Sequence, residues 1–533
     1  MRKRQTKSKQ RVADHGEVFT DEREVNAMLD LVEPEMVRIA SRFLEPACGN
    51  GNFLAEILRR KLTVVNSEHG KNTASYERYA VLSVTTLYGV DILPDNVKRC
   101  RKRLYDIFNR EYSANCKKKT DDETRKAVQD VLRHNVICGN TLKMKKKNGK
   151  PIEFVEWSEE EKEKGRFKRR YCQLKHLLEA NADELIHTAK PEEILPMKFD
   201  VIVGNPPYQL SDGGSGTGIS AKPLYHLFVD QAKKLNPHFL CMIIPARWFA
   251  GGKGLDEFRD EMLGDRRIRV IVDYPSSKEC FDGVNIAGGV CYFLWDRDDS
   301  GDCVVKNRYD GDEETLVREL NEFSIFVRDN IAIRVIRKVL ARHDDLLTNH
   351  NYARNPFGFP SRERGEKNAA TDDIKLISSA GVGFVNRNTV KKNADLIDKY
   401  KVTIGKVVPS NGEVDATPGD GYKVITSLRI LEPGEIHTES YLLLSVFDSA
   451  KEAENFAKYM ALKLPRFLLK QTLTSMNITK NNFMFVPYLD YRQKWTDAEL
   501  FDRYGLSDSQ REWIESVMRP MDIGGNDGEP RNA

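Results

Sequence analysis

The sequence predicts an α/β protein built on a mostly parallel, seven-stranded sheet with helices on both faces. Short apolar runs alternate with amphipathic stretches such as Asn52–Leu62 and Pro223–Leu235, as in strand–helix–strand units. The runs lack polar alternation, which is typical of strands covered on both sides. The seven predicted strands are Arg42–Pro46, Thr85–Ile92, Asn135–Asn140, Phe199–Asn205, His238–Pro245, Ile268–Tyr274 and Gly288–Trp295.

Composition bounds the class of protein. The chain has 533 residues, of which 40% are hydrophobic and 31% are charged, which excludes wholesale disorder and a membrane protein. No run approaches 18 apolar residues, and the basic start is not followed by an apolar segment, so we expect a cytoplasmic protein. The nine cysteines are scattered without a CxxC pair, which predicts reduced thiols and no metal site.

Changes in composition predict the domain boundaries. We expect a basic arm over residues 1–15, an α/β domain over 16–300, a second α+β domain over 307–522 and a disordered tail over 523–533. A charged excursion over about 143–190 interrupts the first domain. It is either a solvated loop and helix or a basic arm near a polyanion. Thr496 with Glu499, and Ser507 with Gln510, have capping-box spacing and predict two closing helices.

A glycine-containing turn follows the first predicted strand, in the segment EPACGNGNFL. Gly49 and Gly51 would let the backbone approach a ligand at a helix N-terminus, although a tight turn without a ligand has the same pattern. Asp91 and Asn140 end the next two strands, so the three strand ends together predict a nucleoside pocket. GxGxxG would need glycine where Leu54 stands, and no P-loop is present, so S-adenosylmethionine fits better than a dinucleotide.

The tetrapeptide Asn205-Pro206-Pro207-Tyr208 ends the fourth predicted strand and is the most specific motif in the chain. The alternative interpretation is a rigid diproline turn. An exocyclic amine on a base is a poor nucleophile because its lone pair is delocalised into the ring. The Asn205 side-chain oxygen and the Pro206 carbonyl could accept its two N–H bonds, with proline fixing the backbone. Tyr208 could stack on the base, which must be flipped out of a duplex.

These motifs resemble the N6-adenine DNA methyltransferases of type II restriction–modification systems in which the cofactor motifs precede the catalytic motif. The opening Gly16–Thr20 resembles that family, with Asp21 where proline is common. Asn140 stands where the family commonly has aspartate. The resemblance implies a Rossmann-like S-adenosylmethionine-dependent methyltransferase domain and a C-terminal target-recognition domain. The cofactor-binding residues that it implies are Thr20, Glu45, Ala47, Cys48, Gly49, Gly51, Phe53, Asp91, Ile92, Asn140 and Leu142.

The same resemblance makes Phe281 the candidate for the second face of the flipped adenine, the alternative being a core aromatic. The glycine-rich segment Ser211–Ser220 is either a loop that orders over the substrate or a flexible connection.

The implied activity is methyl transfer from S-adenosylmethionine to the N6 amine of adenine in double-stranded DNA, as a modification enzyme. We expect a monomer without a fused nuclease, and a separately encoded restriction endonuclease is a candidate partner. The alternatives are an amino-methyltransferase acting on RNA guanine or protein glutamine, and a non-catalytic specificity subunit. The net charge of +4 does not itself indicate DNA, but local tracts such as KMKKKNGK can form a basic cleft.

Overall fold

The computed structural model divides the chain into two compact units, Met1–Glu322 and Phe323–Ala533. It describes residues 5, 11, 17–159, 167–179, 197–210, 222–251, 254–281, 286, 288–309, 311–409, 421–473 and 477–521. The predicted tail, the glycine-rich segment Ser211–Ser220 and most of the predicted basic arm lie outside these residues.

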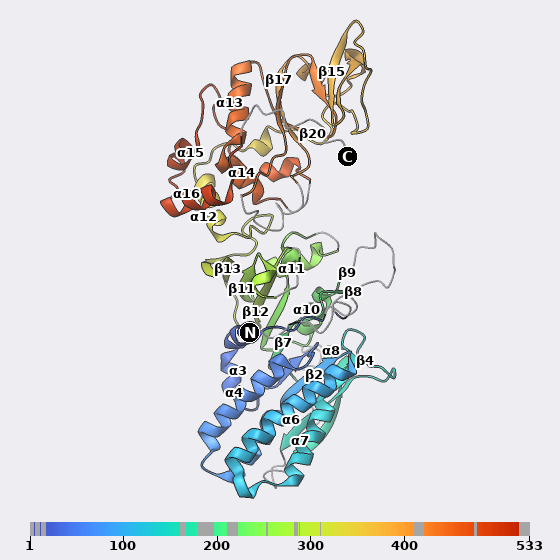
Figure 1. Cartoon of the computed structure of the whole chain (residues 1–533), viewed down its shortest axis with the longest axis vertical. Helices are drawn as coiled ribbons and strands as arrows, with labels where there is room; N and C mark the ends of the chain where they lie inside the picture. The colour runs from blue at the N-terminus through green and yellow to red at the C-terminus, as the bar shows by residue number, and fades with distance from the viewer. Residues whose placement is uncertain are drawn as a thin grey trace, which may run out of the picture. The chain divides into compact units, whose positions relative to one another are not determined.

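A single mixed sheet organises the first unit (Figure 1). Its strand order is β14-β13-β11-β12-β10-β7-β1-β2-β3-β4. The strands are β1 (Phe43–Glu45), β2 (Leu87–Asp91), β3 (Val136–Asn140), β4 (Lys145–Lys146), β7 (Val201–Gly204), β10 (Phe239–Pro245), β11 (Ile268–Tyr274), β12 (Val290–Asp296), β13 (Cys303–Tyr309) and β14 (Asp312–Arg318).

All seven predicted strands form, and the fold class is confirmed. β3, β2, β1, β7 and β10 are mutually parallel, while β12 is antiparallel between β10 and β11. The sheet is longer than predicted. β13 pairs with β11 in parallel, and β14 pairs back on β13, so the first unit ends at Glu322 rather than near residue 300. β13 lies in a segment that the sequence indicates as a domain boundary. Its residues alternate between apolar and polar because only one face of the strand is buried, so it does not resemble the apolar strands of the sheet.

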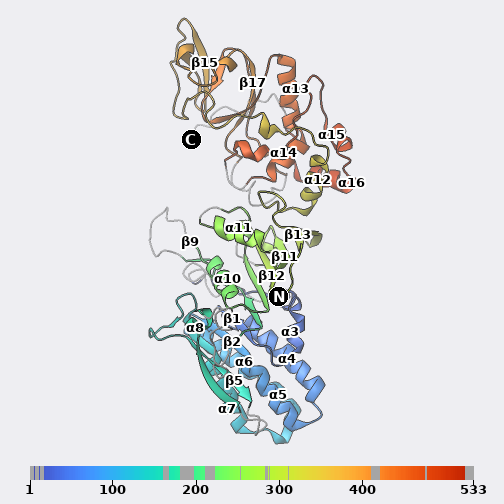
Figure 2. The same ribbon diagram turned by 180° about the vertical axis from the view of Figure 1, so that it is seen from behind.

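Four long helices pack side by side in the first unit, in both views of the ribbon (Figures 1 and 2). They are α4 (Asn52–His69), α5 (Thr73–Thr85), α6 (Pro94–Cys116) and α7 (Asp122–Asn135). α5 accounts for the unusually long distance in sequence between β1 and β2. The other α-helices among the described residues of this unit are α2 (Glu22–Asp30), α3 (Glu33–Val37), α8 (Leu174–Glu179), α10 (Tyr225–Lys234) and α11 (Asp256–Gly264).

The excursion after β3 is more ordered than a solvated loop. β5 (Glu153–Glu159) and β6 (Phe167–Gln173) form an antiparallel hairpin. Phe154 packs edge-on against Tyr88 of β2, and the Tyr88 hydroxyl donates to the Val155 carbonyl at 2.9 Å. The hairpin therefore covers part of the central sheet. The helix expected within this excursion begins at Leu174, directly after β6 ends at Gln173.

The second unit is α+β. Its strands make two three-stranded sheets, β16-β15-β19 and β18-β17-β20. The strands are β15 (Asp373–Ser378), β16 (Gly381–Asn386), β17 (Tyr400–Gly405), β18 (Leu428–Leu431), β19 (Glu435–His437) and β20 (Tyr441–Phe447). The helices are α12 (Asn330–Leu340), α13 (Ala450–Ala461), α14 (Lys463–Lys470), α15 (Asp497–Arg503) and α16 (Asp508–Val517). Both predicted capping boxes form, at the starts of α15 and α16.

No helix in the described part of the chain is both long and apolar enough to span a bilayer. Over the same residues, no group of three or more His, Cys, Asp or Glu side chains is placed to hold a metal ion.

Candidate active site

The turn between β1 and α4 depends on its glycines. Gly51 is the N-cap of α4 with φ +77°, and a Cβ atom there would lie 2.5 Å from the Cys100 sulfur. Gly49 has φ +49°, and a Cβ would lie 3.1 Å from the Phe19 ring. Both positions therefore favour glycine through backbone conformation and through close contact. The turn presents its backbone and the start of α4 at the carboxyl edge of the sheet, where ligands of such folds bind.

Asp91, at the end of β2, is bonded directly to this turn. One carboxylate oxygen accepts the Gly49 N–H at 2.9 Å, and the other accepts the Leu93 N–H at 2.8 Å and the Asn96 amide at 3.2 Å. Burial raises the pKa of Asp91, and these hydrogen bonds oppose the shift. The next residue, Ile92, is 52% exposed although it is apolar, and it lies on the wall of the adjoining cavity.

A cavity of about 280 Å³ lies at the ends of β1, β2, β3 and β7. The structure brings ten of the eleven predicted cofactor residues to its wall, together with Asn205 and Pro207. These ten are Thr20, Glu45, Ala47, Cys48, Gly49, Phe53, Asp91, Ile92, Asn140 and Leu142. Gly51, Pro206, Tyr208 and Phe281 are not on this wall. The cavity also has a wall that the sequence did not indicate, made by Leu224 before α10 and Phe228 within it.

Several polar atoms around the cavity have no hydrogen-bond partner in the part of the chain that the structure describes. The Thr20 hydroxyl, one Glu45 carboxylate oxygen, and the side-chain oxygens of Asn50 and Asn205 are buried and accept no hydrogen bond from any described residue. A buried polar group left unpaired costs about 1–3 kcal/mol, so this arrangement suits a polar ligand. Burial raises the pKa of Glu45 well above its usual value, and the nearby Cys100 and Asp91 add to the shift.

Part of the N-terminal segment is attached to this site. Glu17 accepts hydrogen bonds from Arg11 at 2.6 Å and from Asn96 at 2.8 Å, and Arg11 also pairs with Asp95 at 3.0 Å. Arg11, one residue of the predicted basic arm, therefore binds to acidic groups beside the cavity. The sequence gives no sign of this role for Glu17, because its partner Asn96 lies 79 residues away.

The orientation of the Asn205 side chain is fixed by one hydrogen bond. Its amide nitrogen donates to the Val18 carbonyl at 3.0 Å, so the side-chain oxygen is the end without a protein partner. The turn beyond it is held by the Leu224 N–H, which donates to the Tyr208 carbonyl at 3.0 Å, and by pairing of β8 (Gln209–Leu210) with β9 (Lys222–Pro223). A rigid acceptor thus stands where β7 meets the cavity.

Tyr208 and Phe281 contact each other outside the cavity wall. Their ring centroids lie 6.2 Å apart with an interplanar angle of 70°, and Phe281 is fully buried. Two stacking distances of about 3.5 Å would be needed to place a flat base between them, with the rings parallel. In this arrangement the rings are in direct edge-to-face contact, so a base can enter between them only if at least one ring turns.

Comparison with known proteins agrees with this geometry. Residues 85–281, which include Asp91, Asn140 and the Asn205–Tyr208 motif, match the Eco57I restriction-modification methylase family. An uncharacterised adenine-specific methylase of Mycoplasma pneumoniae is 29% identical over 335 residues, covering 58% of this chain and 74% of the relative. The resemblance to adenine-specific restriction–modification methylases is therefore confirmed.

Similar solved structures include restriction–modification enzymes. The type IIL enzyme MmeI, solved in complex with DNA, is 10% identical with a TM-score of 0.44, over 97% of this chain and 78% of MmeI. A nuclease-deletion mutant of the type ISP enzyme LlaGI, with a DNA substrate mimic, is 10% identical with a TM-score of 0.42, over 95% of this chain and 48% of that chain.

Proposed function

We propose that this chain is a site-specific DNA methyltransferase that transfers a methyl group from S-adenosylmethionine to the N6 amine of a flipped-out adenine. The methylase family and the adenine-specific relative support DNA methyltransferase activity. The observation that carries the finer proposal is the Asn205 oxygen. This oxygen is buried and has no hydrogen-bond partner among the described residues. Asn205 follows the end of β7, and the hydrogen bond from its amide nitrogen to the Val18 carbonyl orients the side chain.

The cavity residues fit S-adenosylmethionine. Ile92 offers an exposed apolar face for the adenine ring, and Asn140 and Leu142 complete that end. Asp91 would accept hydrogen bonds from the ribose hydroxyls. The unpaired Glu45 oxygen would bind the ammonium group of the methionine part, and Thr20 with Ala47 would line the same end. Cys48, Gly49 and Phe53 line the same cavity. Hydrogen bonding to Cys100 and burial raise the pKa of the Cys48 thiol, which is therefore neutral.

The chain's own residues activate the amine. When bound, the cofactor supplies a sulfonium methyl group to the site. Asn205 accepts one N–H of the adenine amine and the Pro206 carbonyl accepts the other, which localises the nitrogen lone pair for attack. Neither acceptor is a base, so the proton leaves the methylated amine to water after the transfer. Tyr208 stacks on the adenine, with Phe281 as the proposed opposite face.

The second unit is the proposed target-recognition domain, which would read the duplex around the adenine. A modification enzyme of this kind acts on DNA that a separately encoded endonuclease would otherwise cut, and a monomer is sufficient for the chemistry. Its recognition sequence depends on a few base-contacting side chains.

The test is methyl transfer from labelled S-adenosylmethionine by the purified full-length chain. We expect label in unmodified DNA as N6-methyladenine at one short sequence, located by long-read sequencing of DNA from a host that expresses the chain. Asn205→Ala should lose the transfer and retain cofactor binding. Label only in RNA or protein, or equal labelling by the variant, would contradict the proposal.

A further inference from the structure

Beside the cofactor cavity, a short lysine-rich turn is fixed to the edge of the main sheet. The lysine hairpin, residues Lys143–Pro151, follows β3 and includes β4 (Figure 1). Gly139 and Asn140 pair with Lys146 and Lys145, and the Lys146 N–H donates to the Lys150 carbonyl at 2.8 Å. The following residue, Ile152, is fully buried, and its N–H donates to the Met144 carbonyl at 3.0 Å. The turn is therefore held on both sides.

The hairpin carries a concentration of positive charge that no carboxylate of the described residues pairs with. Lys143, Lys145, Lys147 and Lys150 are exposed, and none of them forms an ion pair with a carboxylate of the described residues. Other cations on the same unit are paired, for example Lys102 with Asp106 at 2.6 Å and Arg60 with Asp30 at 2.7 Å. Several like charges held on a rigid turn repel one another, and an anionic partner would relieve that repulsion.

The strand order fixes the distance from the hairpin to the catalytic motif. β4 stands four places from β7 in the sheet, through β1, β2 and β3. At about 4.8 Å per strand this is roughly 19 Å. A duplex whose flipped adenine reaches Asn205 must lie across the carboxyl edge of the sheet, and at about 3.4 Å per base pair the hairpin would meet it five to six base pairs away. Lys143 also lies on the cavity wall, so the tract starts at the same edge.

We propose that the lysine hairpin binds the phosphate backbone of the substrate DNA, about six base pairs from the target adenine and without sequence preference. This inference rests on the proposed function, since it assumes that DNA lies across this edge. The contact extends the DNA footprint of the catalytic unit on the side of β3 and β4. It contributes affinity and position, while recognition of the sequence is left to other residues.

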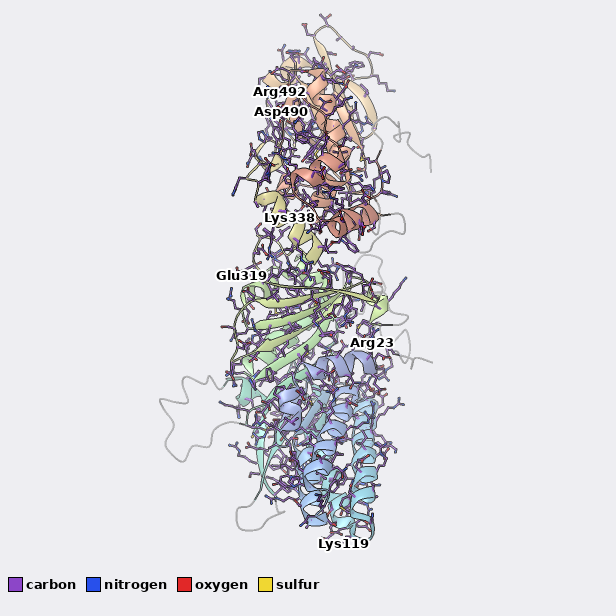
Figure 3. The ribbon with its side chains drawn as sticks, turned by 90° about the vertical axis from the view of Figure 1, so that its left-hand side faces the viewer. Arg23, Lys119, Glu319, Lys338, Asp490 and Arg492 are labelled. Carbon is purple, nitrogen blue, oxygen red and sulfur yellow. The ribbon has the colours of Figure 1, made fainter. Side chains whose placement is uncertain are left out.

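The test compares two triple variants of the full chain that remove equal charge. Lys145→Gln, Lys147→Gln and Lys150→Gln remove three hairpin charges and leave Lys143 on the cavity wall intact. The control changes Lys71, Lys117 and Lys119, which are also exposed and lie beyond the C-terminal ends of α4 and α6, away from the cavity. Figure 3 shows Lys119 at that end of the first unit.

DNA binding is measured by filter binding over a range of salt concentrations. We expect the slope of log K against log salt to become shallower by two to three in the hairpin variant, since each phosphate contact contributes about 0.9. The control should keep the slope of the original chain. Hydroxyl-radical footprinting should lose protection on one flank, five to six base pairs from the methylated adenine.

The outcomes separate this inference from the proposed function. If the original chain neither binds DNA nor methylates it, the proposed function fails. If the original chain methylates DNA and the hairpin variant keeps its salt slope and its footprint, only the hairpin contact is refuted. An equal loss in both triple variants would also refute it, because the effect would then reflect overall charge.

Discussion

The rings of Tyr208 and Phe281 meet edge to face, with their centroids 6.2 Å apart and their planes at 70°. Phe281 is fully buried, and its N–H donates to the Ser277 carbonyl at 2.7 Å. The backbone of this segment is therefore fixed, and capture of a base between the rings requires rotation of a side chain. The contact gives a direct test of which aromatic residues hold the target adenine.

We expect Tyr208→Ala to weaken capture of the flipped base about tenfold to a hundredfold, because stacking on an aromatic ring contributes roughly 1–3 kcal/mol per base. Tyr208→Phe keeps the ring and should retain most capture. The measurement is the fluorescence of 2-aminopurine placed at the methylated position, which rises when the base leaves the stack. Phe281→Leu should reduce the signal if Phe281 is the second face. Unchanged fluorescence and turnover would identify Phe281 as a core aromatic only.

Asn205 and Val18 give the second prediction. Asn205→Ala removes the acceptor, and we expect turnover to fall about 10²- to 10³-fold, the usual effect of losing one positioned hydrogen-bonding group. Asn205→Asp keeps oxygen acceptors but loses the N–H that donates to the Val18 carbonyl at 3.0 Å, so the side chain is no longer oriented. Single-turnover transfer and cofactor affinity are measured together. A parallel loss of affinity in both variants would indicate a collapsed pocket instead of a catalytic defect.

Glu45 predicts a pH dependence of cofactor binding. Because burial raises its pKa well above the usual value, the free protein favours the protonated carboxyl. An ammonium group binds the ionised form, so affinity should rise as pH rises through this raised pKa, and binding should release a proton. The stability of the free protein should change with pH in the opposite direction to cofactor affinity. The stabilising contribution of the protonated Glu45 is present below the unfolded pKa of about 4.5 and is lost as pH rises through the raised pKa of the folded protein.

Calorimetric titration in buffers of different ionisation enthalpy measures the released proton. Glu45→Gln removes the titrating group with little change of shape and should bind the cofactor with a flat pH profile. The Glu45 proposal is wrong if the variant keeps the pH dependence of the original chain.

The second unit contains a buried histidine with a separate consequence. His437 is fully buried, its Nδ1–H donates to the Thr438 carbonyl at 2.8 Å, and burial lowers its pKa to about 4. The neutral form is therefore favoured on folding. The neutral His437 contributes to the free energy of unfolding above its unfolded pKa of about 6.5. As pH falls towards 4 this contribution is lost, and the loss is on the order of 3 kcal/mol in total.

Scanning calorimetry of the full chain should show the transition of the second unit shifting down between pH 6.5 and 4.5. His437→Gln should start from a lower transition temperature and shift less. An equal shift in both proteins would assign the pH dependence to other groups.

The strands and the cavity could be predicted largely from the sequence. The strands that meet at the cavity are apolar runs that end at residues suited to binding a polar ligand, such as Asp91, Asn140 and Asn205. The capping boxes at Thr496 and Ser507 were predicted for the same reason, since a local hydrogen-bond pattern leaves a fixed spacing. The Asn205–Val18 bond could not be predicted, because its acceptor is a backbone carbonyl 187 residues away in the sequence. Every residue has a backbone carbonyl, so the residue type at position 18 does not indicate this hydrogen bond.

The departures have similar physical causes. The sequence leaves the segment of β5 and β6 open as a solvated loop and helix or as a basic arm. Its charged residues conceal Phe154 and Val155, which are buried in the structure. Leu224 and Phe228 reach the cavity from a helix whose apolar face looks like an ordinary core face. Apolar ligand contacts and core contacts use the same residue types, so the sequence does not separate them.

The end of the sheet has a consequence for engineering and for evolution. β14 ends at Arg318, the compact units divide between Glu322 and Phe323, and α12 begins at Asn330. A recombination joint placed after Glu322 would interrupt no helix or strand. Gene fragments encoding different second units could be exchanged at this point while the catalytic unit keeps its complete sheet. Chimeras made at this joint would test the proposal that the second unit sets the recognition sequence.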